Sequence, residues 1–229
     1  MVDSKGYERE GACTLLARLG DLIGVTITCD ALHACNGTLE QARFQGADLL
    51  VTIKDNVPRV LAEVQRQFTI ASDIQSATSL DKGHGRREER RVEVIPLTPH
   101  CDLFPTVNWG MRITRNRTTI RQGRAVAESS ETSYAVATHS PTHPPSVDQF
   151  MHMVRDHWAI ENGLHHKKDR TMKEDRSRLR GSSARIVAGL RTLVTSMLNK
   201  IGGYHPQLMI QLAADTRRLI RMLTCKLVT

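Results

Sequence analysis

Two acidic residues stand in surroundings where a carboxylate could do chemistry. Asp30 ends an apolar, β-branched run, Leu22–Asp30, and Glu161 follows about 130 residues later. At 100° per residue, Glu161 falls in the apolar arc of a predicted helix, together with Phe150 and Val154. Because an unpaired buried charge costs several kcal/mol, Glu161 needs a cation beside it.

Several cations could meet that need. Carboxylates from separate elements can hold Mg²⁺ at one edge of a sheet, and two such ions can activate a hydroxyl nucleophile and stabilise the leaving oxygen of a phosphodiester. Glu161 can instead pair with His157, one helical turn earlier, or with Lys168. Asp30 can instead cap the turn that follows its strand. The spacing of these residues leaves the alternatives open.

The elements that must position Asp30 follow a strand–helix–strand order. Leu22–Asp30 is predicted to be a buried strand, central in a sheet, and Asp48–Lys54 is the next strand. A helix over Asn36–Gln45 between them indicates a parallel pair with a right-handed crossover, and functional groups gather at the carboxyl ends of such strands. A further helix is predicted over Val57–Phe68, with Pro58 in its first turn.

The middle of the chain, residues 69–145, is hydrophilic and rich in predicted strands. The segment His84–Arg91 is predicted to be a charged hinge, and residues 122–132 a polar connection. The strands themselves are predicted over Val92–Leu97, Met111–Ile120 and Tyr134–Ala137. They form either an inserted sheet or the antiparallel edge of the main sheet.

The last third of the chain is predicted to be helical and basic. Ser146 is a good N-cap for the helix that carries Glu161, and further helices are predicted over Ser182–Lys200 and Pro206–Leu227. Residues 151–229 carry 15 Lys or Arg against 6 Asp or Glu, whereas residues 1–150 have a net charge of −1. A basic third on a neutral body favours a polyanion partner, most often nucleic acid, although a solvated basic face is the alternative.

Composition excludes several other classes of protein. No stretch reaches 18 apolar residues, so no transmembrane helix is predicted. The N-terminal residues lack the apolar core of a signal peptide. The five cysteines include no CxxC pair, which argues against a zinc site and against a disulfide framework. Reduced thiols in a cytosol are therefore expected.

Four stretches together resemble the insertion-sequence DDE transposases of the H-repeat-associated group. HWxIENxLH followed by ED is the most specific motif. In the family's order and spacing, the stretches are VTITCDALHA (25–34), GADLLVTIKDNVP (46–58), GHGRREERRV (83–92) and RDHWAIENGLHHKKDRTMKED (155–175). The resemblance implies an α/β, RNase H-like mixed sheet, incomplete at its N-terminal strands, with a β-rich insertion and a C-terminal helical segment. The implied regions are 1–68 with the second catalytic Asp, 69–145 as the insertion, and 146–229 with the catalytic Glu and a basic surface.

The resemblance also implies a site and a reaction. Three acids hold Mg²⁺ or Mn²⁺, Asp30 being the second and Glu161 the third, and the enzyme cuts and rejoins DNA phosphodiesters during transposition of an insertion sequence. Val154 and His157 replace the Tyr and Arg of a family signature in which Glu161 and Lys168 keep their places. The expected DNA contacts are Lys54, Asn56, Arg86, Arg90, Arg155, His157 and Lys168; for the arginines, solvation or a local salt bridge is the alternative.

The family's first acid has no clear counterpart. Upstream of Asp30 stand Asp3, with no predicted strand around it, and Asp21, which begins the same predicted strand roughly 30 Å away. We therefore expect an N-terminally truncated copy with little or no strand-transfer activity, or else a non-catalytic DNA-binding or regulatory fragment of a transposase; whether the chain is an enzyme stays open. The expected partners are double-stranded DNA, at the element ends and the target, and either a second copy or a full-length transposase. The expected location is the cytoplasm, at the bacterial nucleoid, with no membrane.

Overall fold

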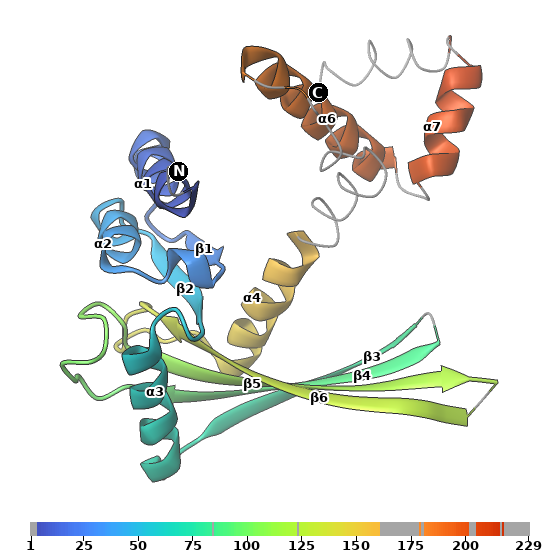
Figure 1. Cartoon of the computed structure of the whole chain (residues 1–229). Coiled ribbons are helices and arrows are strands. Elements are labelled where there is room, and N and C mark those ends of the chain that lie inside the picture. Colours follow the sequence, from blue (N-terminus) through green and yellow to red (C-terminus); the bar gives the residue numbers. More distant parts are fainter. Residues whose placement is uncertain are drawn as a thin grey trace. The chain divides into compact units, whose positions relative to one another are not determined.

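The computed structural model describes residues 4–83, 85–122, 124–160, 179, 181–201, 205–215 and 217. They divide into two units, Met1–Arg155 and Asp156–Thr229. The first unit contains the sheet and most of the described helices, and the second contains α6 (Gly181–Ile201) and α7 (His205–Ala214) (Figure 1).

A six-stranded mixed sheet forms the centre of the first unit, which confirms the predicted α/β class. Its order is β1-β2-β6-β5-β4-β3, with β1 and β2 parallel and every other pair antiparallel. The middle strands therefore continue the main sheet through the β2–β6 pairing and do not form a separate one. The strands are β1 (Thr26–Cys29), β2 (Asp48–Ile53), β3 (Gln75–Gly83), β4 (Arg86–Pro96), β5 (Trp109–Arg121) and β6 (Arg124–Ala137).

The βαβ unit forms as predicted, but its first strand is shorter and lies elsewhere in the sheet. Thr26–Cys29 pair in parallel with Asp48–Val51, and helix α2 (Asn36–Phe44) connects the two strands. Within the described sheet, β1 is an edge strand of intermediate burial, so its predicted central position is wrong. The positive φ of Gly24, 77°, turns the chain just before β1 and shortens the strand predicted from Leu22.

Asp21 consequently does not begin a strand. Its Oδ1 accepts a hydrogen bond of 3.0 Å from the backbone N–H of Ile23, in the turn ahead of β1. The run from Leu22 to Val25 is held by backbone bonds instead of a ladder, because Leu22 N–H donates to Gln45 O at 2.8 Å and Val25 N–H to Leu22 O at 3.0 Å.

The middle of the chain contains more strand than the sequence predicts. Strand β3 was not predicted; the segment taken as a charged hinge is the first half of β4, and the polar connection over residues 122–132 belongs almost entirely to β6. These stretches lack the apolar alternation that marks a strand. Charged side chains pair across the ladder there instead, as Arg115 does with Glu88 of the predicted hinge at 2.9 Å.

Helices cover both faces of the sheet. On one face, α1 (Ser4–Leu19), α2 and α3 (Pro58–Ile70) pack against β2 through a core that includes Leu16, Leu39, Val64 and Val51. On the other face, α4 (Val147–Ile160) buries Phe150 and packs against β4, β5 and β6. Helix α1 was not predicted from the sequence.

The start of α4 is a reciprocal cap, which confirms the N-cap predicted at Ser146. The hydroxyl of Ser146 accepts a hydrogen bond from Gln149 N–H at 3.2 Å, and the Gln149 side chain accepts one from Ser146 N–H at 2.7 Å. Among the described helices, none is long and apolar enough to cross a membrane.

Candidate functional site

Asp30 lies where the sequence placed it, directly after β1 at the carboxyl end of the parallel pair. Its Oδ1 accepts a hydrogen bond of 3.0 Å from Leu32 N–H and caps the short 3-10 helix η1 (Ala31–His33). The capping alternative is thus realised with one carboxylate oxygen. The residue is exposed, and no hydrogen bond from another described residue is seen at Oδ2. That oxygen is open to a ligand from solvent.

Asn56 connects the ends of the two parallel strands. Its side-chain amide donates a 2.5 Å hydrogen bond to the carbonyl of Ala31, in the turn that follows Asp30. Arg9 of α1 holds the same turn through a 2.7 Å bond from Nε to the carbonyl of Leu32. The Asp30 turn is therefore fixed from two sides, and Asn56 acts on it through the backbone.

Three further side chains contribute to the chemistry of this sheet edge. Lys54 follows β2 and is exposed. Burial raises the pKa of the Cys29 thiol to about 11, and the charge of Asp30 adds to the effect, so Cys29 is a neutral thiol near pH 7 and not a nucleophile. His33, which the sequence did not single out, buries Nδ1 with no hydrogen-bond partner among the described residues. The edge combines an exposed carboxylate, an exposed ammonium group and a neutral thiol.

The second predicted acid, Glu161, lies outside the described residues, and so does Lys168. The described end of α4 carries Arg155, in the first unit, and His157, in the second. Arg155 reaches across to β3, where its guanidinium lies 3.4 Å from the carboxylate of Asp81.

A second group of predicted DNA contacts lies on the outer part of the four antiparallel strands. This part, here called the arm, comprises residues 78–91 and 114–132, apart from His84 and Gly123, which are not described. Its inner limit is the row of cross-strand partners Thr78, Arg91, Thr114 and Thr132. The arm carries nine Lys or Arg against five Asp or Glu, a net charge of +4.

One buried acid in the arm is surrounded by arginines, a feature that the sequence did not reveal. Glu88 accepts hydrogen bonds from Arg115 at 2.9 Å and from Arg117 at 3.0 Å, and forms an ion pair with Arg90. Arg90 also lies 3.8 Å from Asp81. Since Glu88 and Arg90 have the same alternation along β4 as Val92 and Val94, they lie on the face that α4 covers.

Four guanidiniums meet in this cluster. Counting Arg155, they form ion pairs with the carboxylates of Glu88 and Asp81. Burial tends to raise the pKa of Glu88, but the arginines outweigh it and the pKa lies below its ordinary value. Burial also lowers the pKa of Arg90, and Arg115 and Arg155 add to that lowering. Apart from Arg155, the cluster lies in the arm, whose net charge of +4 favours the approach of an anion.

The end of the arm is basic and open to solvent. Its two turns follow β3 and β5, and Figure 1 shows the strands running past α3 and α4 toward them. Arg121 and Arg124 are register partners at the end of the β5–β6 hairpin. Five exposed basic residues lie on or beside these turns: Lys82, Arg86, Arg87, Arg121 and Arg124.

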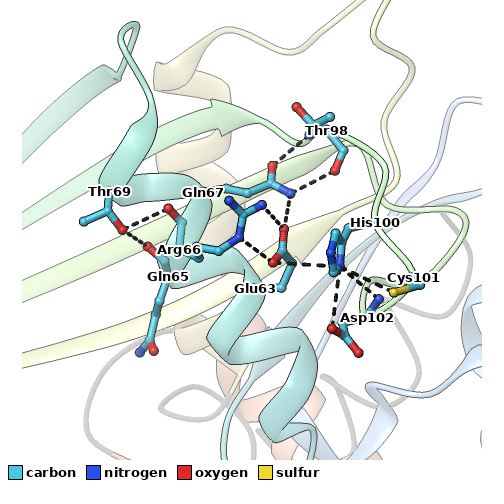
Figure 2. A network of polar contacts seen from close by, with 9 residues as sticks. All are labelled: Glu63, Gln65, Arg66, Gln67, Thr69, Thr98, His100, Cys101 and Asp102. Carbon is cyan, nitrogen blue, oxygen red and sulfur yellow. Dashed lines mark hydrogen bonds and ion pairs between the residues drawn. The ribbon is translucent and has the colours of Figure 1, made fainter.

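A polar network anchors the loop between β4 and β5 to helix α3 (Figure 2). Gln67 binds the backbone of Thr98 in both directions at 2.8 Å, as donor and as acceptor, and also donates to Glu63 at 2.8 Å. Arg66 holds Glu63 with two hydrogen bonds of 2.7 and 2.8 Å. The bonds from Arg66, followed by that from Gln67, lower the pKa of the buried Glu63 to about 2.

Comparison with known proteins finds one family model, described as transposase DDE domain, that matches residues 1–198. The "Putative protein YbfL" of Escherichia coli K12 is 28% identical over 203 residues, covering 86% of this chain and 53% of that protein. The "H repeat-associated putative transposase YhhI" of the same strain is 27% identical over 203 residues, with the same coverage. The "Putative transposase YncI" of Escherichia coli O157:H7 is 27% identical over 190 residues, covering 80% and 48%. The chain spans about half the length of these relatives.

Proposed function

Because the chain belongs to the transposase DDE domain family, we propose that it acts in DNA transposition by cutting and rejoining phosphodiesters with a divalent metal ion. The family has an RNase H-like fold, and the mixed α/β sheet agrees with it. The observation that carries the proposal is the exposed carboxylate of Asp30, fixed at the carboxyl end of the parallel strands.

Asp30 and Glu161 are the proposed ligands of Mg²⁺ or Mn²⁺. Both ions prefer oxygen ligands and keep several waters, which suits a carboxylate that is open to solvent. Bound there, the metal would supply a more acidic water or hydroxyl nucleophile and stabilise the leaving oxygen. Asn56 and Arg9 keep the Asp30 turn in place, and Lys54 neutralises phosphate at the same edge.

The remaining predicted DNA contacts take different parts in this proposal. Arg86, exposed at the end of the arm, contacts a phosphate directly. Arg90 and Arg155 are held in ion pairs of the arginine cluster, so they act indirectly, by adding positive charge near the bound DNA. His157 and Lys168 orient DNA near the cut. The DNA substrates are the element ends and the target.

The nicking of supercoiled plasmid tests the metal role. The plasmid carries the genomic DNA that flanks the coding sequence on both sides, and the chain is added with Mg²⁺ or Mn²⁺. We expect the wild-type chain to nick the plasmid weakly, and Asp30→Asn and Glu161→Gln each to abolish this nicking, because each removes a metal ligand. Nicking that persists unchanged in Asp30→Asn would contradict the proposal.

The chain provides a matched control for Asp30. Asp21 is also exposed, and it also accepts a 3.0 Å hydrogen bond from the N–H two residues later. Asp21→Asn therefore repeats the local change without touching the proposed ligand, and we expect full nicking. Asparagine keeps an acceptor oxygen for the Leu32 N–H, so Asp30→Asn preserves the cap and separates the metal role from folding.

A second candidate function is favoured by the basic arm. A non-catalytic, DNA-binding or regulatory role needs only the arginine cluster and the exposed basic end of the arm. Retention of double-stranded DNA by the wild-type chain in chelator, without nicking when Mg²⁺ or Mn²⁺ is added, would support this role over the catalytic one.

A further inference from the structure

Three consecutive residues with metal-ligating side chains lie in the loop between β4 and β5. The ligand atoms of His100, Cys101 and Asp102 all fall within 4.8 Å of one another. They lie in a different loop from Asp30, and nothing in the proposed transposition chemistry uses them. We propose that they form a zinc site with one position left open to water.

The spacing of the ligand atoms suits a tetrahedral ion. Nδ1 of His100 lies 3.9 Å from Sγ of Cys101 and 3.6 Å from Oδ2 of Asp102. Around a tetrahedral Zn²⁺ with bonds of about 2.0–2.3 Å, neighbouring ligand atoms are roughly 3.3–3.8 Å apart. The two distances from Nδ1 are therefore within a few tenths of an ångström of the tetrahedral values. Rotation of the Cys101 and Asp102 side chains can bring their ligand atoms, which lie within 4.8 Å of each other, to bonding distance.

Nδ1 is the ring nitrogen of His100 that lies near the other two ligand atoms. It accepts a 3.2 Å hydrogen bond from the backbone N–H of Asp102, as it can in the tautomer protonated at Nε2, which leaves a lone pair on Nδ1. Figure 2 shows contacts that run from the His100 ring to the thiol of Cys101 and to the carboxylate of Asp102. A zinc ion would take the Nδ1 lone pair in place of this long N–H contact.

The site stands on a fixed base. Gln67 binds the backbone of Thr98. Leu97 and Leu103, which flank the three ligands in the sequence, are buried in the core and hold the loop on both sides. Glu63, on α3, brings Oε2 to 3.8 Å from Nδ1 of His100 and adds negative charge beside the site. The ligands themselves face solvent, with His100 39% and Asp102 38% exposed, so an ion and its water can reach them.

The ligand set selects the metal. A thiolate and an imidazole favour Zn²⁺, whereas Mg²⁺ demands oxygen ligands and octahedral geometry. This site and the proposed Mg²⁺ site at Asp30 are thus chemically distinct. With three protein ligands, the zinc ion cross-links three side chains of the loop. Its fourth coordination position stays open to exchangeable water.

Cobalt titration of the full-length, metal-free chain with reduced thiols tests the proposal. Co²⁺ replaces Zn²⁺ in such sites, and its bond to a thiolate absorbs in the near ultraviolet. We expect this absorption to saturate at one Co²⁺ per chain and to disappear when Zn²⁺ is added. Cys101→Ser should abolish the absorption, and His100→Gln should weaken Zn²⁺ binding by at least about tenfold.

Two control variants decide what the signal means. Cys13→Ser alters another described cysteine, on α1, and should keep the absorption. Asp30→Asn should also keep it while losing nicking, so failure of the zinc site and failure of the transposase proposal are distinguishable. Absorption that survives in Cys101→Ser, or its absence from the reduced wild-type chain, overturns the zinc site. Circular dichroism confirms that each variant is folded.

Discussion

At the scale of single residues, His139 shows how burial sets a protonation state. The residue follows β6 and is 5% exposed; its Nε2 lies 2.9 Å from the hydroxyl of Thr26, and its ring packs edge-on against Phe150. Burial lowers the pKa of His139 below its ordinary value of 6.5, and Asp48, 3.9 Å away, only partly opposes this. His139 is thus neutral in the fold and joins β1 to the end of β6.

We expect acid to weaken this contact between His139 and Thr26. Because the pKa of His139 is lower in the folded chain than in the unfolded one, the unfolded chain binds more protons below about pH 6.5. The stabilisation by neutral His139 is complete above that pH and declines as the pH falls toward the folded pKa. Urea unfolding of wild type and His139→Gln should show a free-energy difference that shrinks between about pH 7.5 and pH 5.5.

A control for this prediction keeps the imidazole. Thr26→Val removes the hydroxyl that contacts Nε2 but leaves the buried ring, so this variant should retain a pH-dependent stability. If the difference in unfolding free energy between wild type and His139→Gln were the same at both pH values, His139 would not be the titrating group.

At the scale of elements, helix α3 meets the sheet at a glycine. Gly110 is buried in β5, and a Cβ atom there would lie 3.0 Å from Cδ2 of Leu97 and 3.4 Å from Cγ1 of Val64. The missing side chain therefore allows α3 and the segment after β4 to approach β5 closely. The same approach positions the loop that carries His100.

Gly110→Ala should destabilise the fold by about 1–3 kcal/mol, because the added methyl group overpacks this contact. Gly83→Ala is the matched substitution in another strand of the sheet, where a Cβ would meet no atom within 4 Å. We expect Gly83→Ala to leave the free energy of unfolding unchanged or slightly raised. Guanidinium denaturation at one pH compares the two variants, and equal losses would show that crowding by Leu97 and Val64 is not the cause.

Apolar runs made the elements around Asp30 predictable. The run from Leu49 to Ile53 is buried in β2, the cap at Ser146 starts α4, and the run before Asp30 placed this acid at a carboxyl end. The strand predicted over Met111–Ile120 is confirmed by β5, but the rest of the arm was missed because its strands are joined by Arg–Glu pairs, as at Glu88, which leave no apolar period in the sequence. The start of β1 was predicted too early, because a glycine within an apolar run is compatible with a strand or a turn. In the structure, Gly24 forms a turn.

Contacts between distant segments could not be read from the chain. Asn56 was predicted to contact DNA, and its amide is bound to Ala31 O; only the parallel pairing brings these residues together. The ligand atoms of His100, Cys101 and Asp102 converge because the chain turns there, whereas the cysteine spacing alone argued against zinc. Glu161 lies outside the described residues, so its role as a metal ligand stays a prediction.

At the scale of the whole molecule, the charge is more localised than the sequence indicates. Residues 1–150 have a net charge of −1, yet the arm within them carries +4, so the rest of this region carries −5. The net charge summed over residues 1–150 does not reveal the basic arm, because acidic residues elsewhere in this region cancel the charge of the arm. In addition to the basic last third of the chain, the arm is thus a second basic region, to which we expect a polyanion to bind.

The salt dependence of DNA binding should reveal whether the arm is used. Each phosphate neutralised by Lys or Arg contributes about −0.9 to the slope of log K against log salt for duplex DNA. Arg121 and Arg124 are exposed partners at the end of the arm. We expect Arg121→Gln combined with Arg124→Gln to reduce the magnitude of this slope by up to about 2, measured by fluorescence anisotropy in chelator over a range of salt concentrations.

The control must remove the same charge from elsewhere on the surface. Arg18 on α1 and Arg43 on α2 are exposed and lie on helices, away from the arm strands. Arg18→Gln combined with Arg43→Gln lowers the net charge by the same two units and should leave the slope nearly unchanged. Equal losses in the two double variants would mean that DNA responds to the total charge of the chain, and the arm would then have no specific part in binding.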